Sequence, residues 1–220
     1  STYLRIRMTT LLLYPTPVYV GEVDNFDDVQ EEIKTAIDNT DFEYKTDWGN
    51  THRLSDITFT GNVIDQFNMQ TLMSEIHTHV GNYLEDCEVS KSPHYYDNIP
   101  YNVATSWISK YVDGSYAHIH SHGNADISGV YYYSTVPDNA KFFCTSPVDH
   151  FECSTLFSHK GFTQHFDPKP GEIILFPGWL KHGVQTYSGD EDRYSVSFNI
   201  YFVKKENISY GNPEITEDTP

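Results

Sequence analysis

From residue 103 onward, the sequence divides into short β-rich runs with turn signals between them. The runs cover residues 103–112, 117–122, 127–135, 141–145, 171–177 and 193–203. Short strands separated by Gly, Pro, Asp and Asn predict a sandwich or barrel. Residues 146–170 are long, irregular and aromatic, so we expect them to form a loop that faces a substrate.

The first hundred residues predict an edge strand and two helices. Residues 14–20 contain two prolines, which suit an edge strand because proline cannot donate to a central ladder. Asp24 or Asn25 can cap a helix with apolar residues at helical spacing. These apolar residues are Phe26, Val29, Ile33 and Ile37. We expect residues 41–62 to form a polar loop and residues 64–84 a second helix, with His77 and His79 in solvent.

Size and charge limit the classes of protein that the chain can represent. Its 220 residues suffice for one domain with a full core, which we expect over residues 8–205, followed by an acidic tail over 206–220. The net charge of −17 argues against bulk nucleic-acid binding and against an anionic membrane surface. No apolar run is long enough to cross a bilayer.

The cysteines indicate a reducing environment. Cys87, Cys144 and Cys153 are odd in number and form no C-x-x-C pair, so we expect free thiols and a cytoplasmic location. Residues 1–7 precede Met8, a candidate native start, and we assign them no function.

The most informative stretch contains three histidines at alternate positions. Residues i and i+2 of a strand project from the same face, so His118, His120 and His122 would form one row of imidazoles. Such a pair on a rigid strand can offer two nitrogens to one metal ion. A polar strand face in contact with water is an equal alternative for these residues alone.

Two later segments complete the candidate site. Residues 171–177 form an apolar strand that runs into a Pro-Gly turn, and His182 follows, where it could supply a third metal ligand. In residues 193–199, alternation places Arg193 and Ser195 on one face of a strand. The same face carries Ser197 and Asn199, and the opposite face carries Val196, Phe198 and Ile200. An inward-facing arginine requires an anionic partner, whereas an exposed polar face does not.

Together these segments resemble the iron(II)- and 2-oxoglutarate-dependent dioxygenases. The resemblance rests on Tyr111-x-x-Gly114-x5-His120-x-His122, on Ser128-Gly129-Val130-Tyr131-Tyr132, on residues 171–177 with His182, and on Arg193-x-Ser195. It is closest to the prolyl-hydroxylase-like branch, especially to short bacterial and phage proteins. It implies a double-stranded β-helix, or jelly roll, with Fe(II) and 2-oxoglutarate as cofactors, and hydroxylation of a C–H bond in a small-molecule or peptide substrate.

The resemblance also implies roles for individual residues. His120 and His182 match the first and the distal iron ligand. Arg193 matches the residue that pairs with the far carboxylate of 2-oxoglutarate, with Ser195 and Tyr132 beside it. In this family the chemistry is oxidative decarboxylation to succinate and CO₂.

One ligand position departs from the family pattern. His122 stands where most of the superfamily has Asp or Glu. Either His122 is a third neutral ligand, which we favour because it lies two residues from His120, or Asp126 supplies a carboxylate. His118 could lie near the substrate or support a ligand.

Two other hypotheses stay open. The same residues resemble the cupins, which share the barrel and the metal site but need no carboxylate clamp at Arg193. A metal-free jelly-roll binding module is the third possibility. Tyr116, Phe142 and Trp179 could wall a substrate pocket, although plain core packing is the more common explanation for each of them singly.

Overall fold

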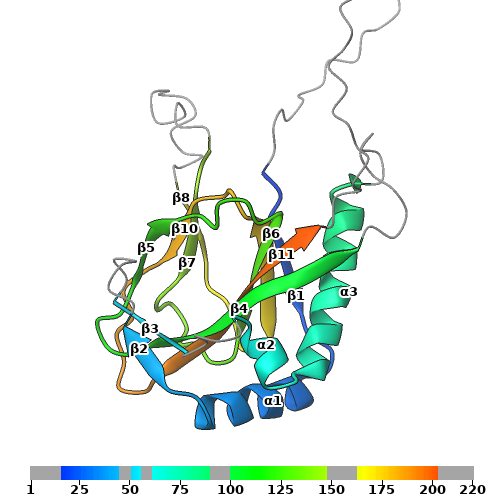
Figure 1. Ribbon diagram of the computed structural model, residues 1–220. Helices are drawn as coiled ribbons and strands as arrows, with labels where there is room; N and C mark the ends of the chain where they lie inside the picture. The colour runs from blue at the N-terminus through cyan, green and yellow to red at the C-terminus, as the bar shows by residue number, and fades with distance from the viewer. Residues whose placement is uncertain (1–15, 45–50, 56–60, 90–99, 148–162, 203–220) are drawn as a thin grey trace, which may run out of the picture.

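The computed structural model describes residues 16–44, 51–55, 61–89, 100–147 and 163–202 (Figure 1). A seven-stranded sheet runs in the order β1 (Tyr19–Glu22), β9 (Glu172–Pro177), β6 (Ile127–Tyr132), β11 (Arg193–Phe202), β4 (Tyr101–Tyr111), β3 (Arg53–Ser55) and β2 (Phe42–Tyr44). A four-stranded sheet runs in the order β5 (Ala117–His120), β10 (His182–Val184), β7 (Phe142–Thr145) and β8 (Thr163–Phe166). The named strands pair antiparallel throughout. The predicted jelly-roll architecture is confirmed.

Alternation along the central strands divides the core into two layers. Val196, Phe198 and Ile200 of β11 pack with the helices in the larger apolar cluster. The opposite face of the same sheet sends Tyr132 and Phe176 into a second cluster with residues of the small sheet. The polar residues of β11 therefore point between the two sheets, as the sequence predicted.

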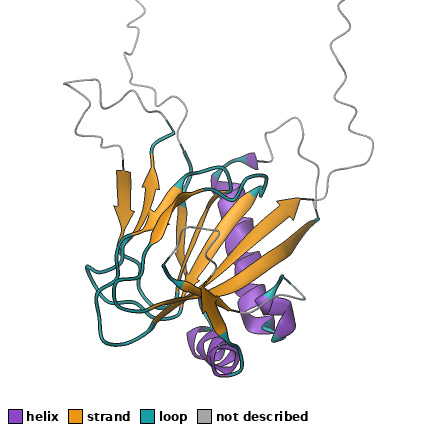
Figure 2. Ribbon diagram, turned by 60° about the vertical axis from the view of Figure 1, so that its left-hand side comes forward, coloured by secondary structure: helices purple, strands orange, loops and turns teal. Residues whose placement is uncertain are grey.

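Helices α1 (Phe26–Asp38) and α3 (Gln70–Asp86) cover the outer face of the large sheet, with the short helix α2 (Val63–Gln66) between them in the chain (Figures 1 and 2). No helix in the described part of the chain is long and apolar enough to cross a membrane. Cys87 and Cys144 are free thiols, and Cys153 lies outside the described residues.

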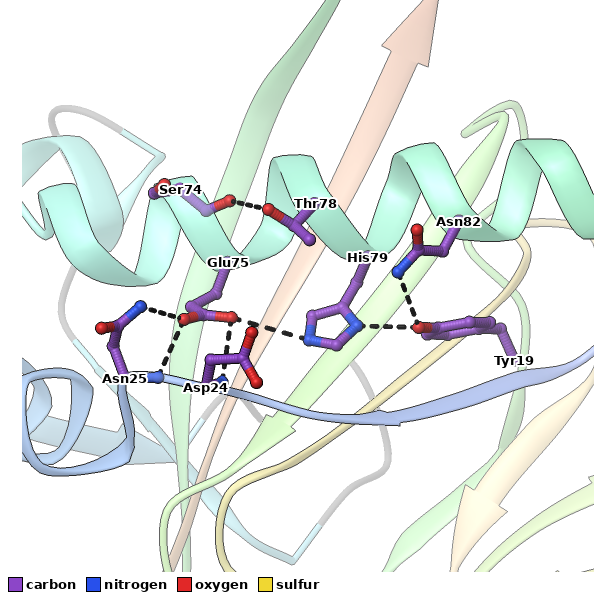
Figure 3. A network of polar contacts seen from close by, with 8 residues as sticks. All are labelled: Tyr19, Asp24, Asn25, Ser74, Glu75, Thr78, His79 and Asn82. Atoms are coloured by element: carbon purple, nitrogen blue, oxygen red, sulfur yellow. Dashed lines mark hydrogen bonds and ion pairs between the residues drawn. The ribbon is translucent and has the colours of Figure 1, made fainter.

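A carboxylate of α3 caps the start of α1. Asn25 occupies the N-cap of α1, but its side chain makes no capping hydrogen bond. Instead the buried Glu75 accepts hydrogen bonds from the backbone N–H groups of Asp24 and Asn25, at 3.3 and 3.0 Å (Figure 3). Its neighbour His79 is hydrogen-bonded through Nδ1 to the Tyr19 hydroxyl of β1 at 2.9 Å. This network ties α1, α3 and β1 together.

A carboxylate of α1 caps the start of α3 in the same way. Met69 occupies the N-cap of α3, and its side chain makes no capping hydrogen bond. Glu32 of α1 accepts from the backbone N–H groups of Thr71 and Leu72 at 2.8 and 3.0 Å. Each helix therefore satisfies free N–H groups at the start of its partner, where negative charge is also favourable.

Several predictions for the N-terminal part were wrong. The second helix is not continuous over 64–84 but breaks around Asn68, which has a left-handed φ of 51°. Residues 41–62 contain strands β2 and β3, which extend the sheet rather than forming a loop. His79 is 6% exposed and packs against β1, whereas His77 is exposed as expected. Apolar periodicity missed His79 because its burial depends on the Glu75 and Tyr19 contacts.

The region 146–170 also differs in part from the prediction. Its last residues form β8, an edge strand that pairs with β7. Residues 148–162 lie outside the described residues, so the predicted substrate-facing loop stays a prediction.

Candidate active site

Three histidines from two neighbouring strands converge between the sheets. His120 ends β5, His182 begins β10, and the two residues are directly paired across the ladder. His122 lies in the turn that follows β5, and its backbone N–H donates to the Gly178 carbonyl at 2.9 Å. One potential ligand atom from each imidazole lies within 4.8 Å of the others. The Nε2 atoms of His120 and His122 are 3.3 Å apart.

The other ring nitrogen of each histidine meets an oxygen acceptor. Nδ1 of His120 lies 2.7 Å from the carbonyl of His118, and Nδ1 of His182 lies 2.8 Å from that of Leu180. These carbonyls can only accept, so both histidines carry their proton on Nδ1. Their Nε2 lone pairs therefore face the centre of the cluster, as in metal sites whose ligands are oriented by outer hydrogen bonds.

A side-chain network orients His122 in the same way. Its Nδ1 lies 2.5 Å from Oδ1 of Asn199 and 2.9 Å from Oγ of Ser128. The Asn199 amide nitrogen donates to Thr105 Oγ1 at 3.1 Å, which fixes the amide with its oxygen toward His122. Three Nε2 acceptors thus converge, and lone pairs at this distance repel one another unless a cation lies between them.

Burial keeps these imidazoles neutral. It lowers the pKa of His122 to about 4 and that of His182 to about 3, and it also lowers the pKa of His120. Neutral imidazole is the form that binds a metal ion.

Arg193 lies beside this cluster with no protein acceptor among the described residues. Its side chain is buried at 2% exposure, and none of Nε, Nη1 and Nη2 makes a hydrogen bond. The guanidinium lies over the rings of Tyr111 and Tyr132, with its central carbon 4.9 and 5.5 Å from the ring centroids. A buried guanidinium is costly unless an anion pairs with it, so this position fits a carboxylate ligand.

Tyr132 supplies a further donor at the same place. Its hydroxyl is buried without a hydrogen-bond partner in the described structure. Burial raises the pKa of Tyr132, so the hydroxyl keeps its proton and can donate to an anion. The Arg193 guanidinium and the Tyr132 hydroxyl are therefore complementary to one carboxylate.

One cavity joins the histidines to the arginine. It is lined by the three histidines together with Tyr132, Arg193, Ser195 and Ser197. No Asp or Glu is among the described lining residues. The three histidines offer this cavity a site for a metal ion, and Arg193 with Tyr132 offers it a site for an acid group, which together match the requirement of a metal-chelating keto acid.

Other candidate residues lie away from the cluster. The carboxylate of Asp126 is exposed and accepts from the backbone N–H of Phe202 at 2.8 Å, and it is not part of the three-histidine group. The side chain of His118 is exposed, so the predicted row of three imidazoles contains only two. Of the candidate wall residues, Phe142 lines the cavity, whereas Tyr116 and the half-exposed Trp179 are not lining residues.

His52, which precedes β3, also lines the cavity, but the sequence did not predict it as a site residue. Its ring stacks on Tyr111 with centroids 4.7 Å apart and 10° between planes, and its Nδ1 lies 3.2 Å from the Tyr116 carbonyl. Burial lowers its pKa to about 4. His52 belongs to the region expected to be a polar loop, where nothing in the sequence signalled a sheet strand.

The sequence of the central part of the chain is similar to that of a known protein family whose description fits this geometry. Residues 105–199 match the model of a family described as putative 2OG-Fe(II) oxygenases. This segment contains all three histidines, Arg193 and Asn199. No curated protein matches the sequence closely.

Solved structures with the same fold come from this class. A 2OG-Fe(II) oxygenase-family oxidoreductase from Burkholderia pseudomallei has a TM-score of 0.55 at 12% identity, covering 78% of this chain and 76% of that one. HygX from Streptomyces hygroscopicus, with nickel and 2-oxoglutarate bound, also has a TM-score of 0.55 at 12% identity, covering 84% and 82%. A prolyl-4-hydroxylase from Pseudomonas putida has a TM-score of 0.52 at 11% identity, covering 86% and 94%.

The family match and the jelly roll with its histidine cluster indicate a 2OG-Fe(II) oxygenase. The predicted enzyme class, with Fe(II) and 2-oxoglutarate as its cofactors, agrees with the family match over residues 105–199 and with the histidine group.

Proposed function

We propose that the protein hydroxylates a C–H bond of its substrate, with His120, His122 and His182 as metal ligands and Arg193 as the anchor of 2-oxoglutarate. The reaction consumes the substrate, O₂ and 2-oxoglutarate and yields the hydroxylated product, succinate and CO₂. The single observation that carries this assignment is a buried arginine without an acceptor in the same cavity as three converging Nε2 atoms.

The residues have separate tasks in this reaction. The histidines hold the metal ion, which supplies the activation of O₂ and of the keto acid when it is bound. Arg193 and the Tyr132 hydroxyl bind the far carboxylate of 2-oxoglutarate, and Ser195, which also lines the cavity, lies on the same face of β11. This clamp sets the direction in which the keto acid enters. The apolar rings of Phe142 and Phe176 line the cavity beside His182, with ring centroids 5.6 and 4.6 Å from its own, and exclude water from that side of the metal site.

The third ligand is proposed as His122 rather than Asp126. The His122 ring faces His120, and Asn199 with Ser128 holds its proton on the far nitrogen. The Asp126 carboxylate is occupied with the Phe202 backbone. A cupin-type protein would use the same histidines, but it would give Arg193 no ligand to bind.

The substrate is proposed as a small molecule or a peptide. HygX has been solved with hygromycin B bound, and a prolyl hydroxylase from Trichoplax adhaerens with a similar fold has been solved with a peptide fragment bound, so the two structures illustrate both kinds. The acidic chain disfavours nucleic acid as a partner and an anionic membrane as a location. We propose residues 8–205 as one oxygenase domain that works in the cytoplasm.

The experiment is a turnover assay with purified protein, Fe(II), O₂ and 2-oxoglutarate. We expect succinate to form slowly without substrate and faster when the correct substrate is added from a metabolite or peptide pool. Omission of Fe(II) and the His182→Ala variant serve as controls, and both should abolish succinate formation. A protein that retains iron but neither binds nor consumes 2-oxoglutarate would contradict the proposal and favour the cupin hypothesis.

A further inference from the structure

None of the described residues that line the active-site cavity is acidic, although the protein as a whole is strongly acidic. The chain has 31 Asp and Glu residues against 14 Lys and Arg. Among the described residues that line the cavity, none is Asp or Glu, and Arg193 is the only one with a formal charge. The carboxylate nearest in sequence to the histidines, Asp126, is directed to the backbone of Phe202. The inside of the cavity therefore differs in charge from the rest of the molecule.

The charge of the loaded site follows from these residues. A divalent metal ion and Arg193 contribute three positive charges, and each metal-binding histidine is neutral because its one proton lies on Nδ1, facing an oxygen acceptor, and its Nε2 carries the lone pair that binds the metal. The two carboxylates of 2-oxoglutarate contribute two negative charges. One positive charge remains, whereas a site with a carboxylate as third ligand would be neutral.

We propose that the substrate of this site carries a carboxylate that lies in the cavity and balances the remaining charge. This inference rests on the proposed function, because it assumes that His122 is the third ligand and that 2-oxoglutarate binds at Arg193. An unpaired charge in a water-poor cavity is unfavourable, and an anionic substrate removes that cost as it binds.

The negative net charge of the protein limits the size of an anionic substrate. A net charge of −17 repels polyanions such as nucleic acids, and the repulsion grows with the charge of the ligand. A small molecule with a single carboxylate experiences the least repulsion and still compensates the site. The substrate class is therefore a small carboxylic acid, for example an amino acid or a keto or hydroxy acid.

The test uses cobalt(II)-loaded protein with 2-oxoglutarate bound, and it compares acetate with acetamide as probes. The two probes have the same shape and differ in charge. Visible absorption of the cobalt ion reports ligands that bind at or beside it, without any need for turnover. We expect acetate to change the spectrum saturably and acetamide to leave it unchanged.

Matched variants separate charge from shape. His122→Asp adds one negative charge at the ligand position, and His122→Asn has nearly the same shape without the charge. One unit charge at a few ångströms amounts to a tenfold or larger effect on affinity, by rough Coulomb arithmetic. We therefore expect acetate to bind at least about tenfold more weakly in His122→Asp than in His122→Asn, with the two variants compared at equal cobalt content. Ser121→Asp, which adds the same charge at an exposed position, should bind acetate like the wild type.

Each outcome decides the inference. Equal responses to acetate and acetamide, or equal acetate affinity in the His122→Asp variant and the wild type, would overturn it. Cobalt content and 2-oxoglutarate affinity are measured first by elemental analysis and calorimetry. Failure of these two measurements contradicts the proposed function itself, whereas their success with no preference for acetate overturns only the substrate class.

Discussion

Replacement of Arg193 by methionine should move two properties in opposite directions. Methionine keeps much of the side-chain volume and removes the charge, while every metal ligand stays in place. Arg193 is 2% exposed and none of its three nitrogens has an acceptor among the described residues. Its stacking on Tyr111 and Tyr132 recovers only about 1–2 kcal/mol per ring.

Without 2-oxoglutarate, the Arg193→Met variant should be the more stable protein. Replacing buried charges by well-packed apolar groups is commonly neutral or stabilising by about 1–4 kcal/mol. We expect a gain of about 1 kcal/mol in the free energy of unfolding, which raises the Tm of a chain of this size by about 2–4 °C. Thermal unfolding followed by circular dichroism measures it.

With 2-oxoglutarate, the order should reverse. Loss of one partner of a buried charged pair costs about 2–5 kcal/mol in binding. At about 1.4 kcal/mol per tenfold, the dissociation constant rises about thirtyfold or more. The wild type gains about 2.7 kcal/mol at a ligand concentration of about 100 times its dissociation constant, and the variant gains about 0.9 kcal/mol or less.

Calorimetric titration of metal-loaded, oxygen-free protein checks the binding, and elemental analysis checks that metal content is unchanged. A variant that binds 2-oxoglutarate as tightly as the wild type would refute the role of Arg193. A variant that is less stable than the wild type without ligand would show that Arg193 serves the fold instead.

Three further predictions concern the histidine site and the helices. His122→Ala should reduce iron binding far more than Asp126→Ala, and the reverse order in elemental analysis would make Asp126 the third ligand. Asn199→Ala should weaken metal affinity about 10- to 100-fold in a metal titration, because it frees the Nδ1 side of His122; an unchanged affinity would show that Asn199 does not orient the ring. Glu75→Gln and Glu32→Gln should each lower the free energy of unfolding by about 0.5–2 kcal/mol in denaturant titration, since each removes the charge that caps the partner helix. Unchanged stability in both variants would contradict the reciprocal capping.

The central strands of the fold could be predicted from the sequence, because the alternation of apolar and polar residues along a strand is a local property. Val196, Phe198 and Ile200 face the helices, as the period of two predicted. The same rule placed Arg193 and Ser195 in the cavity. The short strands β8 and β10 were not predicted, because β10 has only three residues and β8 lies in a stretch that was interpreted as an irregular loop.

The contacts that orient the site are long-range, and the sequence could not reveal them. Asn199 and Ser128 lie 77 and 6 residues from His122, and only the pairing of β11 with β6 brings them to one ring. His118 was expected in one row with His120 and His122. It lies in β5 two residues before His120, yet its side chain is exposed, and the third member of the histidine group, His182, comes from β10.

The most direct test of the central claim is the iron content of His120→Ala, His122→Ala and His182→Ala beside the wild type, with circular dichroism as the check on folding. We predict about one Fe(II) per wild-type chain, and loss of iron in each variant without loss of the fold. Stoichiometric iron retained by the folded variants would contradict the three-histidine centre and the oxygenase chemistry assigned to it.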